Sequence, residues 1–187
     1  MSKELVLIIG GARSGKSALA ERLARRADRV LFVATAQALD GDMARRIATH
    51  RSNRPASWNT LEEPLDLAAS LSEAVKGHDV VLLDCLTLWV SNMLLKDEGS
   101  RDAERMILAS TEDLLELYET GGATWIVVSN EVGLGVVPPS SLGRAYRDVL
   151  GRVNQLVAGR ADKVYLALAG MALEMKELGA RPIDEIE

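Results

Sequence analysis

The chain has 187 residues, of which 48% are hydrophobic, and a formal net charge of −5 at pH 7. This length and apolar content suit one domain, residues 1–187, with a substantial core. The acidic balance argues against a nucleic-acid partner, which needs a basic face, and no apolar stretch approaches the roughly 20 residues of a membrane span. Cys85 is the single cysteine and cannot form an internal disulfide, so we expect a cytoplasmic protein. Residues 1–4 include an acid and run straight into the first predicted strand, so we expect no signal peptide.

The first predicted elements surround a glycine-rich turn. The apolar run 5–9 predicts a buried strand, and residues 17–26 predict a helix. Between them the sequence reads Gly10-Gly11-Ala12-Arg13-Ser14-Gly15-Lys16-Ser17. Glycine at the first and sixth positions, followed by Lys-Ser, predicts a phosphate-binding loop. A plain strand-to-helix turn is the alternative, but a chance match in a chain of this composition is on the order of a few in a thousand.

Each part of this loop has a physical task. The glycines let the backbone curl so that successive N–H groups point into one concavity, and the following helix adds the partial positive charge of its N-terminus. Lys16 would reach the β- and γ-phosphates of a nucleoside triphosphate, and the Ser17 hydroxyl would hold Mg²⁺. We therefore predict a nucleoside triphosphate site here.

Strands and helices alternate along the rest of the chain. Further strands are predicted at 30–34, 79–84, 125–129 and 163–169, with a short extended piece at 58–61. Helices are predicted at about 43–51, from the first turn at Pro64 to about 76, and at 86–96, 101–119 and 140–160, with a polar turn at 96–100.

The predicted strands are continuously apolar. This pattern favours an α/β fold: a mostly parallel sheet with helices on both faces. Ligands of such sheets bind at the carboxyl ends of the strands. The polar residues at those ends should therefore converge on one crevice with the phosphate loop; they are Thr35, Asp84 with Thr87, and Ser129 to Glu131.

Asp84 follows four apolar strand residues, at the position of a Walker B carboxylate. Mg²⁺ is held by one or two carboxylates together with nucleotide phosphates and water, so Asp84 and Ser17 are the candidate metal ligands. An aspartate that only caps the next helix is the alternative interpretation.

His50 allows two interpretations. It lies at helical spacing from Met43 and Ile47, which is typical of a core or helix-end histidine. An imidazole beside an α-phosphate is also a competent nucleophile and forms a covalent phosphoramidate. Four arginines nearby would bind phosphate oxygens; they are Arg45, Arg46, Arg51 and Arg54. Trp58 stands outside any strong apolar pattern, which makes it a candidate for stacking on a ligand.

Several segments together carry a resemblance to one family. They are Gly10-Gly11-Ala12-Arg13-Ser14-Gly15-Lys16-Ser17, Ala34-Thr35-Ala36, Asp42-Met43-Ala44-Arg45-Arg46-Ile47, His50-Arg51 with Arg54-Pro55, Leu82-Leu83-Asp84-Cys85-Leu86-Thr87, Ser129-Asn130-Glu131-Val132-Gly133-Leu134-Gly135, Arg147-Asp148 and Gly151-Arg152-Val153-Asn154-Gln155. They span nearly the whole chain, in order. The chain resembles the bifunctional adenosylcobinamide kinase / adenosylcobinamide-phosphate guanylyltransferases of cobalamin biosynthesis.

The resemblance implies two reactions. A nucleoside triphosphate, ATP or GTP, first phosphorylates the aminopropanol hydroxyl of adenosylcobinamide. GTP then transfers GMP to adenosylcobinamide phosphate, which gives adenosyl-GDP-cobinamide and releases pyrophosphate. The resemblance also implies a single P-loop NTPase domain with a RecA-like strand order, and a homotrimer with active sites near subunit boundaries.

The resemblance assigns roles to individual residues as well. The family's guanylyl-histidine falls on His50, and Lys16 serves catalysis from the phosphate loop. Contacts to the guanine nucleotide fall on Ala34, Thr35, Ala36, Arg51, Arg54, Glu62 and Asp84. Asn130 and Glu131 are candidates near the cobinamide substrate.

Two other functions fit the phosphate loop. One is a simple P-loop kinase of a small molecule, in which His50 is structural. The other is a nucleotide-switched binding module without covalent chemistry. A covalent label from α-labelled GTP would distinguish the transferase from both.

Overall fold

The computed structural model describes residues 2–38, 40–96 and 102–186. Seven strands form one sheet in the order β3-β2-β4-β5-β1-β6-β7. Their bounds are β1 Leu5–Gly10, β2 Val30–Ala34, β3 Asn59–Glu62, β4 Val80–Asp84, β5 Thr124–Asn130, β6 Lys163–Leu168 and β7 Met171–Glu174. All neighbouring pairs are parallel except β6 and β7. The mostly parallel sheet is confirmed, and the final antiparallel strand was not predicted.

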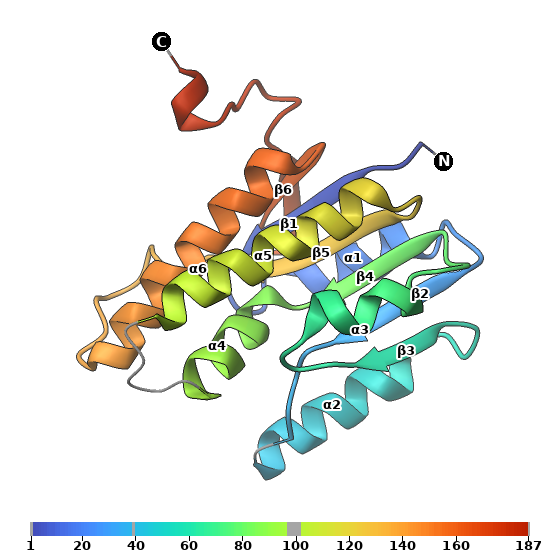
Figure 1. Cartoon of the computed structure of the whole chain (residues 1–187), viewed down its shortest axis with the longest axis horizontal. Helices are drawn as coiled ribbons and strands as arrows, with labels where there is room; N and C mark the ends of the chain where they lie inside the picture. The colour runs from blue at the N-terminus through green and yellow to red at the C-terminus, as the bar shows by residue number, and fades with distance from the viewer. Residues whose placement is uncertain (1, 39, 97–101, 187) are drawn as a thin grey trace.

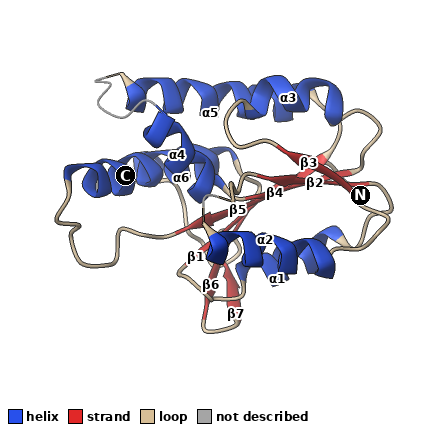
Figure 2. Cartoon of the chain, turned by 90° about the horizontal axis from the view of Figure 1, so that it is seen from below, coloured by secondary structure: helices blue, strands red, loops and turns tan. Residues whose placement is uncertain are grey.

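Helices cover both faces of the sheet (Figure 1). Their bounds are α1 Lys16–Ala24, α2 Gly41–Asn53, α3 Leu67–Ala74, α4 Leu86–Lys96, α5 Ala103–Thr120 and α6 Ser141–Arg160, with a short 3₁₀ helix, η1, at Ile183–Glu185. Figure 2 shows α3, α4, α5 and α6 on one side of the sheet and α1 and α2 on the other. Residues 97–100 of the turn predicted at 96–100, and residue 101 of the helix predicted at 101–119, lie outside the described residues.

The two helical layers bury alternate residues of the same strands. In β1, Leu5 and Leu7 belong to the core under α3 to α6, whereas Val6 and Ile8 pack in the core under α1. Successive side chains of a strand point to opposite faces, so a strand covered on both faces needs apolar residues throughout. This requirement explains the continuous apolar runs of the sequence.

Two local expectations were wrong. Helix α3 begins at Leu67 rather than at Pro64, because the Glu63 carboxylate accepts hydrogen bonds from the backbone N–H groups of Leu65 and Asp66, both at 2.9 Å, and holds a turn there. Trp58 is a core residue, 8% exposed and stacked on Phe32 with ring centroids 6.5 Å apart, so it is not free to stack on a ligand.

Candidate active site

The phosphate loop is built into the interior of the protein. Gly10 ends β1 with Asn130 of β5 on one side and Ala167 of β6 on the other. A Cβ atom at Gly10 would lie 2.2 Å from the Ala167 carbonyl oxygen, so the packing of β6 admits only glycine there. Gly15 has a φ of 100°, in the left-handed region that favours glycine. The local structure thus explains glycine at the first and sixth positions of the motif, Gly10 and Gly15.

Lys16 lies inside the loop, with 7% of its surface exposed. Its Nζ donates hydrogen bonds to the Gly11 carbonyl oxygen at 2.6 Å and to the Ser14 hydroxyl at 3.5 Å. Burial lowers the pKa of Lys16, although the negative charge of Asp84 opposes the shift. A cation held in this desolvated position is favourable once an anion such as a phosphate binds next to it.

Asp84, at the end of β4, stands at the electrostatic centre of the site. Burial raises the pKa of its carboxyl group, and a hydrogen bond with the Ser17 side chain opposes the rise. The charges of His50, Lys16 and Arg54 also act to lower this pKa, so charged groups from α1, α2 and the segment after α2 act electrostatically on Asp84. Among the described residues, no group of three or more His, Cys, Asp or Glu side chains is arranged to hold a metal ion.

The ends of β2 and β4 are joined through Thr35. Its hydroxyl donates to the Cys85 carbonyl oxygen at 2.7 Å and accepts from the Cys85 N–H at 2.9 Å. The side chain is completely buried, so it orders the edge of the sheet. Ala34 pairs with Asp84 on one side and with Glu62 on the other, and both Ala34 and Ala36 are half-buried at this edge.

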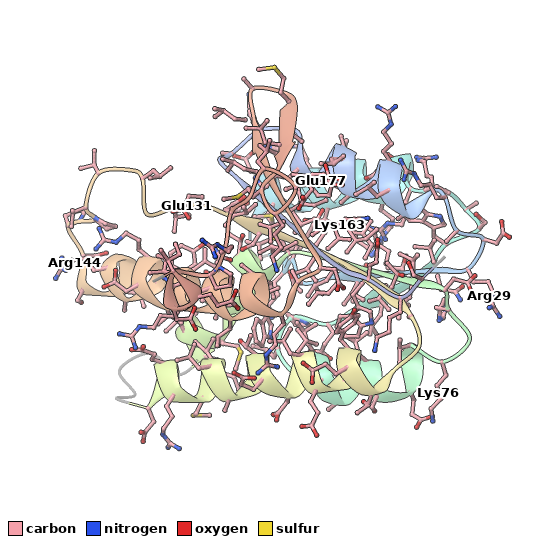
Figure 3. The ribbon with its side chains drawn as sticks, turned by 90° about the horizontal axis from the view of Figure 1, so that it is seen from above. Arg29, Lys76, Glu131, Arg144, Lys163 and Glu177 are labelled. Carbon is pink, nitrogen blue, oxygen red and sulfur yellow. The ribbon has the colours of Figure 1, made fainter. Side chains whose placement is uncertain are left out.

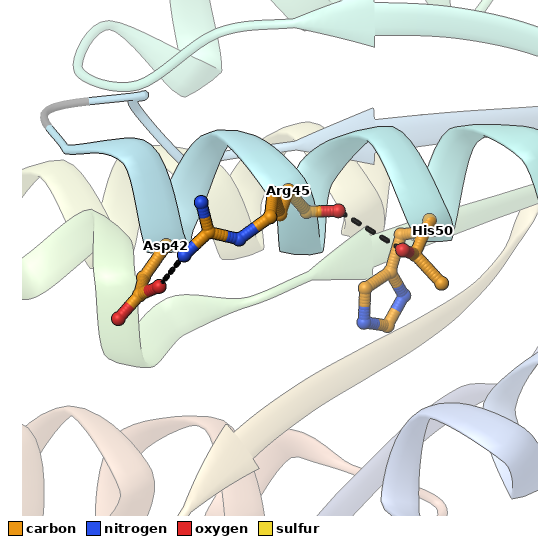
Figure 4. Close-up of a pocket in the computed structure, with 4 residues that line it drawn as sticks. Asp42, Arg45 and His50 are labelled. Carbon is orange, nitrogen blue, oxygen red and sulfur yellow. Dashed lines mark hydrogen bonds and ion pairs between the residues drawn. The ribbon is translucent and has the colours of Figure 1, made fainter.

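His50 lies on the exposed surface of α2. Together with Asp42, Arg45 and Thr49 it lines an open pocket of about 340 Å³, and Figure 4 shows Asp42, Arg45 and His50 along one side of the helix. Asp42 and Arg45 form an ion pair. The interpretation of His50 as a core histidine is therefore wrong: α2 flanks the sheet, and none of its side chains with a described exposure is buried.

Two predicted arginines take different positions. Arg51 is exposed and forms an ion pair with Glu62, which ties α2 to the end of β3. Arg54 is half-buried, with its guanidinium 3.5 Å from the centre of the Phe32 ring and Nη1 bonded to the Thr60 hydroxyl at 2.8 Å. Its Nε is buried without a hydrogen-bond partner, and burial lowers its pKa. Contacts with Phe32 and Thr60 thus hold the Arg54 guanidinium in a partly desolvated position.

The end of β5 completes the same edge of the sheet. The backbone N–H of Glu131 donates to the Gly10 carbonyl oxygen at 3.1 Å, and the Thr87 hydroxyl accepts from the N–H of Asn130 at 2.8 Å. Asn154 of α6 donates to the Asn130 carbonyl oxygen at 3.0 Å. The predicted convergence of strand-end polar residues around the phosphate loop is thus present in the structure.

One support of the loop was not predicted from the sequence. The turn between β6 and β7 places the N–H of Gly170 3.1 Å from the carbonyl oxygen of Ser14. Gly170 has a φ of 79° and Ala169 a φ of 52°, so both residues are in the left-handed region. The glycine was the available signal, because a Gly after an apolar run is typical of a tight turn.

The comparisons with known proteins identify the family. Residues 6–175 match the family described as cobinamide kinase / cobinamide phosphate guanyltransferase. The chain belongs to this family. The bifunctional adenosylcobalamin biosynthesis protein CobP of Pseudomonas aeruginosa is 51% identical over 172 residues, which are 91% of this chain and 96% of that protein. The proteins named CobU of Escherichia coli and Salmonella typhimurium are each 39% identical over 180 residues, 92% of this chain and 99% of theirs.

Membership of the family confirms the predicted function, a bifunctional kinase and guanylyltransferase of cobalamin biosynthesis. The fold agrees with a second comparison. The crystal structure of the RadB recombinase superimposes with a TM-score of 0.50 at 16% identity, over 87% of this chain and 73% of that one. The predicted RecA-like P-loop fold is confirmed, with β5 between the phosphate-loop strand β1 and the Asp84 strand β4. Among the described residues, no helix is both long and apolar enough to cross a membrane.

Proposed function

We propose that the family's two reactions take place at this single sheet edge and that GMP passes through a covalent bond to His50. The supporting observation is that His50, on the exposed surface of α2, acts electrostatically on Asp84, the carboxylate that also faces Lys16 and Ser17 of the phosphate loop. The phosphate loop and His50 are more than 30 residues apart in the sequence, but Lys16 of the loop and His50 both act electrostatically on the Asp84 carboxylate.

In the guanylyl-transfer step, loop amides and Lys16 bind the β- and γ-phosphates of GTP, and Arg51 and Arg54 bind oxygens of the α-phosphate. An unprotonated ring nitrogen of His50 attacks the α-phosphorus, the bond to the bridging oxygen breaks, and pyrophosphate leaves with that oxygen. An oxygen of cobinamide phosphate then attacks the same phosphorus and displaces His50. Ala34, Thr35, Ala36 and Glu62 shape the side of the site nearest the nucleoside.

Ser17 and Asp84 fit Mg²⁺. They are a hydroxyl and a carboxylate, both hard oxygen ligands, and they interact with each other at the mouth of the loop. The ion would supply positive charge to the nucleotide phosphates. The desolvated Asp84 carboxyl favours such a partner, since its ionised form is otherwise disfavoured there.

The substrates in this proposal are ATP or GTP, adenosylcobinamide and its phosphate, in the cytoplasm. We also propose a homotrimer. Its support is a set of exposed apolar side chains near the carboxyl end of the chain, which a second copy would cover. They are Leu168, Met171, Leu173, Leu178, Ile183 and Ile186.

One experiment tests the covalent step. The protein is incubated with α-labelled GTP and Mg²⁺ and denatured, and protein-bound label is measured for the natural chain, His50→Ala and His78→Ala. His78 is the matched control, because it is the other histidine and lies at the amino ends of the strands, away from the phosphate loop. There its Nε2 is 2.8 Å from Asn59 Nδ2. We expect an acid-labile label on the natural chain and on His78→Ala, and none on His50→Ala.

The other outcomes assign the other functions. Label on His50→Ala would place the nucleophile elsewhere. An unlabelled natural chain that phosphorylates cobinamide would be a simple kinase, and GTP binding without either activity would indicate a nucleotide-switched module.

A further inference from the structure

The segment that leaves β5 presents apolar side chains to solvent. Leu134, Val136 and Val137 are 90%, 96% and 59% exposed. They lie within four consecutive positions, between the end of β5 and the start of α6. Large apolar groups gathered in this way mark a binding surface, whereas single exposed apolar residues are ordinary.

This segment is held at both ends. Near its start, the Glu131 carboxylate accepts a hydrogen bond from the N–H of Gly133. Near its end, Arg144 donates to the carbonyl oxygens of Pro138 and Pro139 at 3.1 Å and 2.7 Å. Figure 3 shows Glu131 and Arg144 on either side of a loop that projects from the body of the molecule. Hydrogen bonds thus hold both ends of the segment, and the three apolar side chains between them are exposed.

The loop begins next to the nucleotide site. The N–H of Glu131 donates to the carbonyl oxygen of Gly10, the first residue of the phosphate loop, at 3.1 Å. The residue before it, Asn130, is paired with Gly10 in the sheet. A substrate lying on this loop would therefore lie beside the phosphate loop, at the carboxyl end of β5.

We propose that residues 133–137 form the docking surface for the corrin ring of cobinamide, with Glu131 and Arg144 as its polar rim. The inference rests on the proposed function. The ring has apolar faces and carries amide groups around its edge. Leu134, Val136 and Val137 cover a face, and the carboxylate and guanidinium at the ends of the loop match the amides. The aminopropanol arm extends from the ring, so its hydroxyl reaches the nucleotide while the ring stays outside.

This occupant suits the loop better than a second copy of the chain does. The loop offers three apolar side chains between two charged ones, which matches a single flat molecule with polar edges. The other exposed apolar side chains, near the carboxyl end, include Leu168, Met171 and Leu173 of the β6–β7 hairpin. They form a larger group suited to a protein contact.

The test is a double variant, Leu134→Ser with Val136→Ser, and the matched control is Met106→Ser, which also removes an exposed apolar side chain (44% exposed) but outside the loop and outside the proposed contact between copies. The measurements are the equilibrium dissociation constants of cobinamide and GTP, the KM for cobinamide in the kinase reaction, and the sedimentation coefficient. We expect the double variant to raise the Kd and KM for cobinamide about tenfold to a hundredfold, with the Kd for GTP unchanged. The control variant should leave all of them unchanged.

The outcomes separate this inference from the proposed function. If the natural chain binds cobinamide and the double variant binds it equally well, the docking surface is wrong and the proposed function stands. If the natural chain binds GTP but no cobinamide, the proposed function fails, and the inference with it. A double variant with a changed sedimentation coefficient and unchanged cobinamide Kd would assign the loop to a contact between copies and overturn the inference. Thermal unfolding of each variant, with and without GTP, verifies that it is folded.

Discussion

The phosphate loop and helix α2 approach the same carboxylate from different structural settings. The loop is built into the core: Ser14 and Lys16 are 5% and 7% exposed, and β6 closes directly on Gly10. Helix α2 lies on the outside, without a buried residue among those whose exposure is described, and the Arg51–Glu62 ion pair ties it to β3. An amide cradle must keep a fixed geometry to bind phosphate, whereas a nucleophile must attack, carry and release a group. Under the proposed function, the fold thus places the phosphate cradle in the core and the nucleophile on an outer helix.

The largest expected effect is on the cradle. In Lys16→Ala the triphosphate loses its buried cation, so both the kinase and the guanylyl-transfer rates should fall by about 10² to 10³-fold. Lys76→Ala is the control, because Lys76 is exposed in the turn after α3 and pairs only with Glu73 among the ion pairs of the described residues. Steady-state rates for both reactions are the measurement. Guanylylation that survives in Lys16→Ala would mean that His50 does not share the triphosphate bound by the loop.

Two glycine-to-alanine substitutions, one in the phosphate loop and one in α2, compare how tightly the two regions are packed. Gly10→Ala places a methyl group against the Ala167 backbone oxygen, so we expect a loss of about 1–3 kcal/mol in the free energy of unfolding. In Gly41→Ala, at the start of α2, the new Cβ lies 3.7 Å from an Arg45 nitrogen, and the change should be neutral or stabilising by about 0.4–1 kcal/mol. Urea denaturation of both variants measures the difference. Equal losses would contradict the contrast between a packed loop and an outer helix.

A smaller effect tests the anchor that follows β3 and holds the turn before α3. Burial of the Glu63 carboxyl acts to raise its pKa, but hydrogen bonds from Ser70, Leu65 and Asp66 outweigh it, and the net pKa is lowered. A folded-state pKa below the unfolded value gives stability above the ordinary glutamate pKa of about 4.3, which is lost as the pH falls through the folded-state value.

Glu63→Gln should therefore cost about 1 kcal/mol at pH 7, and the difference from the natural chain should disappear on acidification. Unfolding free energies from pH 7 down to pH 3 would show this. Glu73→Gln, which alters only an exposed ion pair, should change stability by a few tenths of a kcal/mol. A Glu63→Gln deficit that persists undiminished in acid would mean that its charge is not the source of the stability.

Sequence reasoning was most successful where local chemistry decides the structure. An apolar run at 5–9 followed by glycines favours a buried strand and a phosphate loop, and the structure has both. The apolar residues 80–83 favour a second buried strand, and Asp84 ends it as predicted. It failed where distant contacts decide. The position of β7 depends on its pairing with β6, and the start of α3 depends on the Glu63 side chain. The apolar spacing of Met43, Ile47 and His50 favoured burial, but α2 has only the margin of the sheet beside it, and the imidazole faces solvent.

The hydrogen bond from Gly170 to Ser14 has a consequence for biogenesis. During translation the amino-terminal strand and helix leave the ribosome first, yet one wall of their cradle is supplied by the final hairpin. A nascent chain that ends after β5 has the whole glycine-rich motif and lacks the backbone that closes on it at Ala167 and Gly170. The surroundings of the phosphate loop are therefore complete only once the last strands of the sheet have been added.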